Sequence, residues 1–260
     1  MRKKEVIKPK EFTLSYSMFS KTDKGLCRPN NEDEASYLDR EYVKIGIIAD
    51  GMGGHRMGEV ASRIAKDTII DYFNNNVTTT DLAEIKKHIK KAVKEANSVI
   101  HRLSSRNEKY YGMGTTLVMA LIFPDYTLIV NCGDSRCYTY SKDRGIHQET
   151  VDQTVVQYLY KLGAITKEEI KTNPKRHVLM NALGISPHAS YDLNIINNDY
   201  DDILLCSDGL SNMVEEAELE KIFDENEGKN AEELTNIFIK TALKNGGIDN
   251  IGVTVMEVAK

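Results

Sequence analysis

Aspartates stand at the ends of apolar runs at several places in the chain, where a carboxylate could do chemistry. In IGIIADGMGG the apolar run ends at Asp50 and Gly51. The pattern returns at Asp134 in LIVNCGDSR and at Asp208 in ILLCSDGLS, and Asp249 in NGGIDNIGVTV comes just before an apolar run. An Asp beside a Gly is common in turns, so one such site would indicate little. A set that flanks core strands is harder to explain by turns alone.

A further acidic pair, Glu32 and Asp33, comes just before another strand-like segment. Carboxylates gathered at one end of a sheet repel one another, and cations between them make their proximity tolerable. Oxygen ligands without His or Cys favour Mg²⁺ or Mn²⁺, and a glycine lets its backbone carbonyl approach a metal closely. The sequence therefore predicts that Asp50 is a metal ligand, with the carbonyl of Gly51 beside it. Such clusters typically support phosphoryl chemistry, in which two metals share a water and bind phosphate oxygens.

The elements that must position these carboxylates are strands and amphipathic helices. Asp-Gly at residues 50–51 could also form a hairpin turn, but Val60, Ile64 and Tyr72 follow at helical spacing, which favours a strand-to-helix junction. A second helix is predicted from a capping box at Asp81, and a last one begins near Asn230. Strands are predicted at residues 12–20, 35–39, 43–49, 115–122, 126–132, 136–141, 191–196, 201–207 and 251–258.

Residues 150–190 interrupt the strand pattern with short helical pieces, a capping box at Thr166 and a polar loop at Asn173-Pro174. This composition indicates a flap over the scaffold, and its few apolar positions predict mobility relative to the core. The chain contains no low-complexity segment and no convincing linker. We therefore expect a single domain over residues 1–260, with strands and helices in separate layers and residues 1–11 as a basic tail.

Composition excludes several classes of function. The net charge of -5 and the pI near 5.8 argue against nucleic acid as a partner. No apolar run approaches the ~20 residues of a membrane span, and no signal peptide precedes the first strand. The four cysteines lack a C-x-x-C pair or metal-ligand spacing, so we expect reduced packing residues rather than a disulfide. These features predict a cytoplasmic protein without a membrane partner.

The order of the motifs resembles that of the metal-dependent Ser/Thr protein phosphatases of type 2C, bacterial branch, from about Thr22 to Val258. The landmarks are GLCRPNNED, ADGMGGHRMGEVAS, GMGTTLVMAL, NCGDSRCYTY, LGAITKEEIKTNPKRHVLMNALG, DDILLCSDGLSNMV and GGIDNIGVTV. The resemblance implies an α+β fold, in which a central β-sandwich of two antiparallel sheets carries helices on both outer faces and a flap insertion. The binuclear metal site would lie at one end of the sandwich.

The same resemblance implies a role for each acidic residue. Asp50 would bridge two Mn²⁺ or Mg²⁺ ions, with the Gly51 carbonyl as a further ligand. Asp208 and Asp249 would bind one metal. Asp33 would support the second metal directly or through water, with Glu32 close by. Asp134 would join Asp208 in holding a possible third, weaker metal.

The implied mechanism is direct attack of a metal-bridging water on phosphoserine or phosphothreonine, without a phosphoenzyme. Arg28 and Asp50 would be the catalytic residues, because Arg28 matches the arginine that grips the phosphate. Ser207 and Asn250 would orient their neighbours. The substrates would be phosphorylated proteins, including a Ser/Thr protein kinase whose signalling the enzyme reverses. A monomer is the default expectation.

Some positions depart from the family pattern. Met52 stands where eukaryotic relatives carry a histidine proposed as general acid, and the nearby His55 is more typical of a positioned loop residue. Gln153 and Thr154 replace the usual His and Ser, and Asn181 stands where an arginine is common. Because the last three lie in the flap, they concern substrate preference rather than the chemistry.

Two alternatives stay open beside the protein phosphatase interpretation. A module that only binds phosphoproteins would be expected to lack a metal ligand, whereas every expected position is filled here. A hydrolase of small phosphate esters or nucleotides is compatible with the acidic set, because such a site recognises mainly the phosphate. Comparison of phosphopeptides with nucleotides as substrates separates this alternative from the first interpretation.

Overall fold

The structure is a computed structural model that describes residues 12–53 and 57–259. The predicted tail and His55 lie outside the described residues. The described strands form two antiparallel sheets. The first sheet has the order β1 (Ser15–Asp23), β11 (Ile251–Ala259), β10 (Asp202–Cys206), β7 (Arg136–Ser141), β8 (Gly145–Gln148). The second has the order β2 (Asp33–Asp39), β3 (Lys44–Met52), β5 (Leu117–Ile122), β6 (Thr127–Cys132), β9 (Asp192–Ile196), and the short β4 (Gly114–Thr115) pairs with β3.

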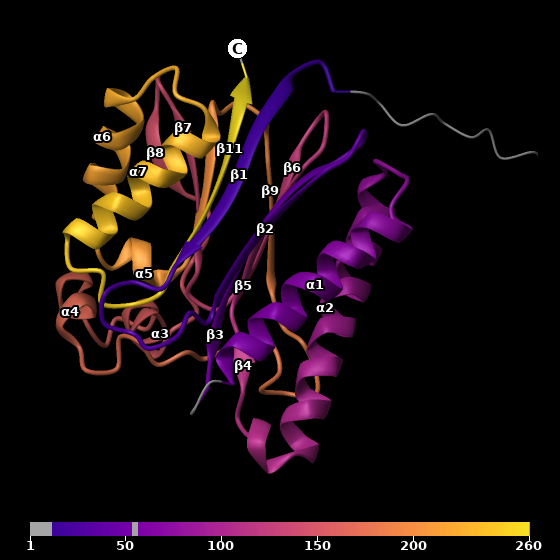
Figure 1. The fold of residues 1–260 in the computed structure, drawn as a ribbon, viewed down its shortest axis with the longest axis vertical. Helices are drawn as coiled ribbons and strands as arrows, with labels where there is room; N and C mark the ends of the chain where they lie inside the picture. Colours follow the sequence, from indigo (N-terminus) through magenta and orange to yellow (C-terminus); the bar gives the residue numbers. More distant parts are fainter. Residues whose placement is uncertain (1–11, 54–56, 260) are drawn as a thin grey trace, which may run out of the picture.

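Helices cover the outer faces of both sheets, which confirms the expected α+β sandwich (Figure 1). On one side lie α1 (Gly58–Asn76) and α2 (Leu82–Arg106), followed by the short η1 (Glu108–Tyr110). On the other lie α6 (Glu216–Glu225) and α7 (Ala231–Lys244), and the short α5 (Asp208–Ser211) follows β10. Within the described ranges, no helix has the length and apolar character needed to cross a membrane.

Three apolar clusters join these layers. The alternation of side chains along β3 shows why: Ile45 and Ile47 face α1 and α2, whereas Ile48 joins the cluster between the two sheets. The third cluster lies between the first sheet and its helices. A strand that is buried on both faces needs a continuous apolar sequence, and this explains the unbroken apolar run before Asp50.

Local sequence signals predict where most of the helices and strands begin or end, and one predicted strand needs correction. The caps predicted at Asp81, Thr166 and Asn230 form, and at the last two a glutamate completes the capping box in both directions. The first strand, predicted at residues 12–20, instead runs from Ser15 to Asp23. Its ends are set by pairing with β11 along its whole length, which the local pattern does not contain.

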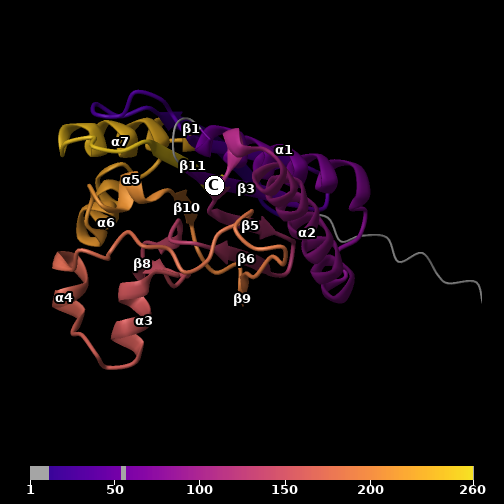
Figure 2. The same ribbon diagram turned by 90° about the horizontal axis from the view of Figure 1, so that it is seen from below.

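The flap carries the two short helices α3 (Val155–Lys161) and α4 (Lys167–Thr172). Figure 2 shows both standing away from the sheets. Val156 is the buried residue of α3, and α4 has none. This small burial is in keeping with the mobility expected of the flap, which stays a prediction.

The cysteines offer a first test of the packing. All four are free: Cys27 is exposed, whereas Cys132, Cys137 and Cys206 are buried. Burial raises the pKa of Cys132 to about 12 and that of Cys206 to about 12, so little reactive thiolate forms at neutral pH. We expect a thiol reagent to modify only Cys27 quickly in the folded protein, and all four thiols after unfolding in urea. Fast modification of a second thiol before unfolding would contradict this packing.

Candidate active site

Strand pairing brings the first two carboxylates together. Asp33 at the start of β2 lies opposite Asp50 near the end of β3 in the antiparallel register. Ser207, at the end of β10, donates a hydrogen bond from Oγ to Asp33 Oδ2 at 2.6 Å. The same Oγ accepts a hydrogen bond from Gly252 N in β11 at 2.8 Å. Ser207 therefore links Asp33 in the second sheet to β10 and β11 in the first sheet.

Close backbone contacts position the other two metal-site candidates. Asp208 begins α5, and a Cβ at the next residue, Gly209, would lie 1.8 Å from the carbonyl oxygen of Asn250. Only a glycine lets α5 rest on the turn that carries Asp249. The side chain of Asn250 fixes this turn further, because its Oδ1 accepts a hydrogen bond from Glu32 N at 2.8 Å.

A second close contact holds Gly51. A Cβ on Gly51 would lie 2.3 Å from the carbonyl carbon and oxygen of Gly58 at the start of α1. The backbone nitrogen of Gly51 also donates to the carbonyl oxygen of Glu32 at 3.0 Å. The predicted metal-binding carbonyl therefore lies between a helix start and a strand start, both of which fix its position.

The carboxylates raise one another's pKa. Burial is the largest cause, and it raises the pKa of Asp33 to about 7 and that of Asp134 to about 7. The pKa of Asp50 is raised well above its ordinary value by burial and by the charges of Asp33, Asp208, Asp134 and Asp249. Asp50 is thus the carboxylate whose pKa is raised by the charges of four other aspartates. Carboxylates that share a site in this way favour either a bound proton or a bound cation.

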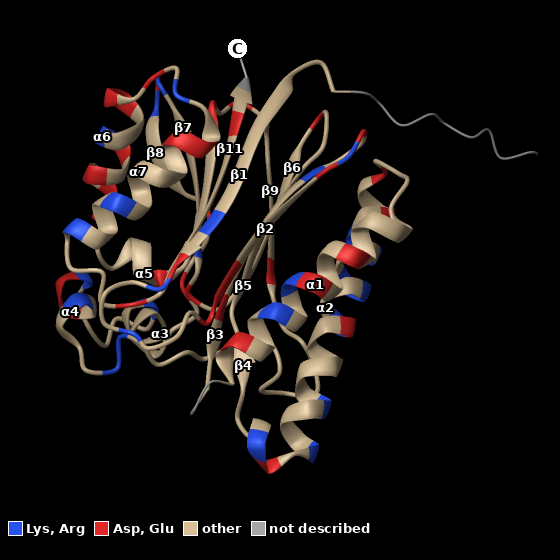
Figure 3. Ribbon diagram, viewed as in Figure 1, with Lys and Arg blue, Asp and Glu red and all other residues tan. Residues whose placement is uncertain are grey.

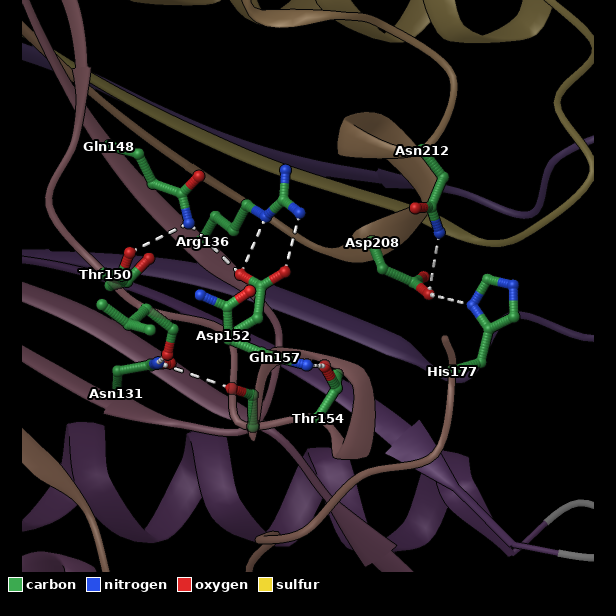
Figure 4. A network of polar contacts seen from close by, with 12 residues as sticks. Asn131, Arg136, Gln148, Thr150, Asp152, Thr154, Gln157, His177, Asp208 and Asn212 are labelled. Atoms are coloured by element: carbon green, nitrogen blue, oxygen red, sulfur yellow. Dashed lines mark hydrogen bonds and ion pairs between the residues drawn. The ribbon is translucent and has the colours of Figure 1, made fainter. Parts of the chain in front are cut away.

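The donor set, made of carboxylates and a backbone carbonyl, fits hard divalent cations. Among the described residues, no three His, Cys, Asp or Glu side chains form a ready-made metal-binding group. Protein groups contact the outer carboxylates instead. Arg28 Nη2 donates to Asp249 Oδ2 at 2.8 Å, while Asp208 Oδ2 lies 3.7 Å from His177 Nδ1 and accepts from Asn212 Nδ2 at 3.1 Å (Figure 4).

One cleft of about 1160 Å³ contains nearly all the residues predicted from the sequence. Its acidic end is lined by Arg28, Glu32, Asp50, Gly51, Asp134, Asp208 and Asp249. Asp33 does not line the cleft, because it is only 4% exposed; it lies beside Asp50 on the neighbouring strand. The opposite wall belongs to the flap, through residues such as Thr154, Tyr160 and His177. Figure 3 shows acidic residues at the strand ends near β3 and α5.

An ion pair at the base of the flap was not foreseen from the sequence. Arg136 Nε and Nη2 donate to the two carboxylate oxygens of Asp152 at 2.9 and 2.7 Å, and Gln148 Nε2 also donates to Asp152 (Figure 4). Arg136 follows Asp134 by two residues, so the pair joins the loop of one predicted ligand to the start of the flap. Neither residue belongs to a local pattern that could have revealed the contact.

Comparison with known proteins gives matches along nearly the whole chain. The sequence model of the family Protein phosphatase 2C matches residues 28–243. The serine/threonine phosphatase stp of Listeria monocytogenes is 36% identical over 239 residues, 91% of this chain and 94% of that protein. The protein phosphatase PhpP of Streptococcus pneumoniae is 32% identical over 240 residues, 91% and 95% of the two chains.

Solved structures agree with this similarity. The serine/threonine phosphatase Stp1 from Staphylococcus aureus has a TM-score of 0.88 at 31% identity, covering 97% of this chain and 98% of that one. The catalytic domain of PstP in complex with two manganese ions has a TM-score of 0.81 at 32% identity, covering 95% and 100% of the two chains.

Proposed function

This chain belongs to the protein phosphatase 2C family, and we propose that its acidic cleft hydrolyses phosphoserine and phosphothreonine in proteins with the help of two divalent cations. The enzyme is thus a protein-serine/threonine phosphatase. One observation carries the assignment: Arg28, Asp50, Asp208 and Asp249, far apart in the sequence, line the same cleft. That cleft combines the oxygen ligands of a metal site with an arginine suited to phosphate.

The metal ligands we propose are Asp50, the Gly51 carbonyl, Asp208 and Asp249. Asp33 supports them from its position beside Asp50, and Glu32 from the cleft wall. Asp134 and Asp208 would take a third ion. When bound, such cations activate a water as nucleophile and neutralise phosphate oxygens. Support comes from the mutual repulsion of the carboxylates and from the two manganese ions in the structure of PstP.

Arg28 is the residue that we propose binds the phosphate. Its side chain is 53% exposed at the cleft, and its planar guanidinium can donate two parallel hydrogen bonds to phosphate oxygens. Its bond to Asp249 keeps the guanidinium next to the acidic residues. Arg28 can therefore hold a phosphoryl group beside the carboxylate cluster and stabilise the negative charge that develops on its oxygens.

The raised pKa values give a prediction for the metal-free protein. Between pH 3.8 and about 7, folded Asp33 keeps a proton that the unfolded chain has released. The stability of the metal-free protein should therefore fall as the pH rises through this window. We expect Mn²⁺, at about 100 times its dissociation constant at pH 7.5, to raise Tm by roughly 5–10 °C at that pH. The same Mn²⁺ concentration should raise Tm by less at pH 5, because protons compete for the carboxylates and weaken metal binding. Thermal scans with EDTA and with Mn²⁺ measure this, and equal shifts at both pH values would contradict it.

Hydrolysis of a phosphothreonine peptide tests the proposed function directly. We expect turnover that requires Mn²⁺, is abolished by EDTA and is unaffected by okadaic acid, an inhibitor of the unrelated phosphatase class. Nucleotides and small phosphate esters serve as competing substrates. Faster hydrolysis of a nucleotide than of the peptide would favour the small-ester alternative. Peptide binding without hydrolysis by folded, Mn²⁺-loaded protein would favour a module that only binds phosphoproteins.

A further inference from the structure

Two of the positions that depart from the family pattern, Gln153 and Asn181, contact each other across the flap. Asn181 Nδ2 donates a hydrogen bond to Gln153 Oε1 at 2.8 Å, although 28 residues separate them in the sequence. From this contact we infer that Gln153 and Asn181 form a positioning pair, which fixes the flap wall of the cleft for peptide substrates. The inference rests on the proposed function, because it concerns how the same cleft receives a phosphopeptide.

The hydrogen-bonding capacity of the Gln153 side chain is fully used. Its Oε1 accepts from Asn181 Nδ2 and from Gly133 N, the latter at 2.9 Å. Its Nε2 donates to Asp192 Oδ2 at 2.8 Å and to the carbonyl oxygen of Asn131 at 3.3 Å. An amide can accept twice and donate twice, whereas a neutral histidine offers one donor and one acceptor. A histidine at this position could not make the same set of bonds.

Asn181 complements this arrangement. Its Nδ2 uses its second hydrogen for the carbonyl oxygen of Ser190, at 3.0 Å. The side chain therefore links the returning end of the flap both to Gln153 and to the segment before β9. An arginine here would carry a charge and a much longer side chain, so a short amide suits the neighbouring glutamine. The two departures thus fit each other as one polar unit.

Gln153 and Asn181 lie at the base of the flap, where the two ends of the flap segment run side by side. Met180 N donates to the carbonyl oxygen of Gln153 at 2.8 Å, and Val155 N donates to that of Val178 at 2.9 Å. The bridge between Thr154 and Leu179 lies between these bonds, and both of these residues line the cleft. Gln153 N also donates to the carbonyl oxygen of Gly133, directly before Asp134. Gln153 therefore joins the flap wall to the acidic end of the cleft.

Kinetics of Gln153→Ala, Asn181→Ala and the double variant test this role. We expect KM for a phosphothreonine peptide to rise about tenfold in each single variant, because unsatisfied polar groups loosen the flap base. The double variant should be no worse than the more affected single variant, because the two residues act through one contact. The kcat for a small phosphate ester should change less than twofold, because a small substrate does not need the flap wall. Equal proportional losses of kcat/KM for the peptide and for the small ester would overturn the inference.

Asn198→Ala is the matched control. Asn198 Nδ2 donates to the carbonyl oxygen of Phe123 at 2.6 Å, and its Oδ1 accepts from Thr127 Oγ1 at 2.7 Å. This amide also links segments of the second sheet. It does so at Thr127, where β6 begins, and not near Gly133, which follows the last residue of β6. For Asn198→Ala we expect a fall in Tm similar to that of Gln153→Ala and Asn181→Ala, but an unchanged KM for the phosphothreonine peptide. Amide hydrogen exchange at residues 176–181 should accelerate in the flap variants and not in Asn198→Ala. Unchanged exchange there in Gln153→Ala would overturn the inference.

A charge swap separates positioning from a merely structural role. Gln153→Glu keeps the side-chain shape but places a carboxylate against Asp192, 2.8 Å from the former donor. This variant should show the raised peptide KM, and adding Asp192→Asn should recover at least half of the loss, because Asn restores a donor. Absence of rescue would contradict the hydrogen-bond account. Wild-type turnover that requires Mn²⁺ is measured first: its absence counts against the proposed function, and normal turnover with unaffected variants counts against the pair alone.

Discussion

Replacing Asp50 with Asn is expected to reduce the Mn²⁺-dependent kcat/KM for a phosphothreonine peptide by about a thousandfold or more. The charges of Asp33, Asp208, Asp134 and Asp249 all act on Asp50, which stands opposite Asp33 in the strand register. An asparagine has nearly the same size but no charge, so it would leave the proposed cations without their central ligand. Kinetics and calorimetric titration with Mn²⁺ measure the two losses separately.

Stability distinguishes this loss from simple unfolding. Because burial and neighbouring charges raise the pKa of Asp50, its ionised form destabilises the metal-free fold at neutral pH. Metal-free Asp50→Asn should therefore be at least as stable as the wild type at pH 7.5. Asp67→Asn, at an exposed position on α1, is the matched control and should keep full activity. An active Asp50→Asn variant would refute the metal-site assignment.

The sequence predicts those parts of the site that lie at the ends of apolar runs. Asp50 lies near the end of a buried strand, and Asp134 and Asp208 follow two others, so local pattern alone places them at strand ends. The residue patterns predict strands and helices in separate layers, whereas the two-sheet sandwich is what the resemblance in motif order implies. Asp33 shows the limit of this reasoning: its position at the start of a strand is visible in the sequence, but its burial beside Asp50 depends on the pairing of β2 with β3.

Contacts between distant polar residues could not be predicted in this way. The bonds of Arg136 to Asp152 and of Asn181 to Gln153 depend on the path of the flap, which no periodicity encodes. The helix α6 also escaped detection, although Leu219, Ile222 and Phe223 are buried at helical spacing. Its other positions are mostly charged, so the apolar stripe is only one turn long. The edge strand β8 is short and half-exposed, and its pairing with β7 rather than its sequence defines it.

The second large effect is expected from Gly209→Ala. This substitution makes two contributions of opposite sign to the free energy of unfolding. Alanine favours a helix over glycine by about 1 kcal/mol, which would stabilise α5. However, the added Cβ would lie 1.8 Å from the carbonyl oxygen of Asn250. This is a backbone atom that no side-chain rotation can move, so the overlap should outweigh the gain. We expect a loss of about 3 kcal/mol in the free energy of unfolding, measured in urea.

The same displacement should impair catalysis in the protein that still folds. To relieve the overlap, either α5 or the turn at Asp249 and Asn250 must shift, and each carries a proposed metal ligand. Because a misplacement of about 1 Å can cost about a hundredfold in rate, we expect a loss of that order in kcat. Gly228→Ala is the control: its φ of 83° is strained for alanine, but nothing lies within 4 Å of the new Cβ. Gly228→Ala should lower the free energy of unfolding by about 1 kcal/mol and leave kcat unchanged. Equal effects of the two substitutions on kcat would mean that the contact between Gly209 and Asn250 does not position the carboxylates.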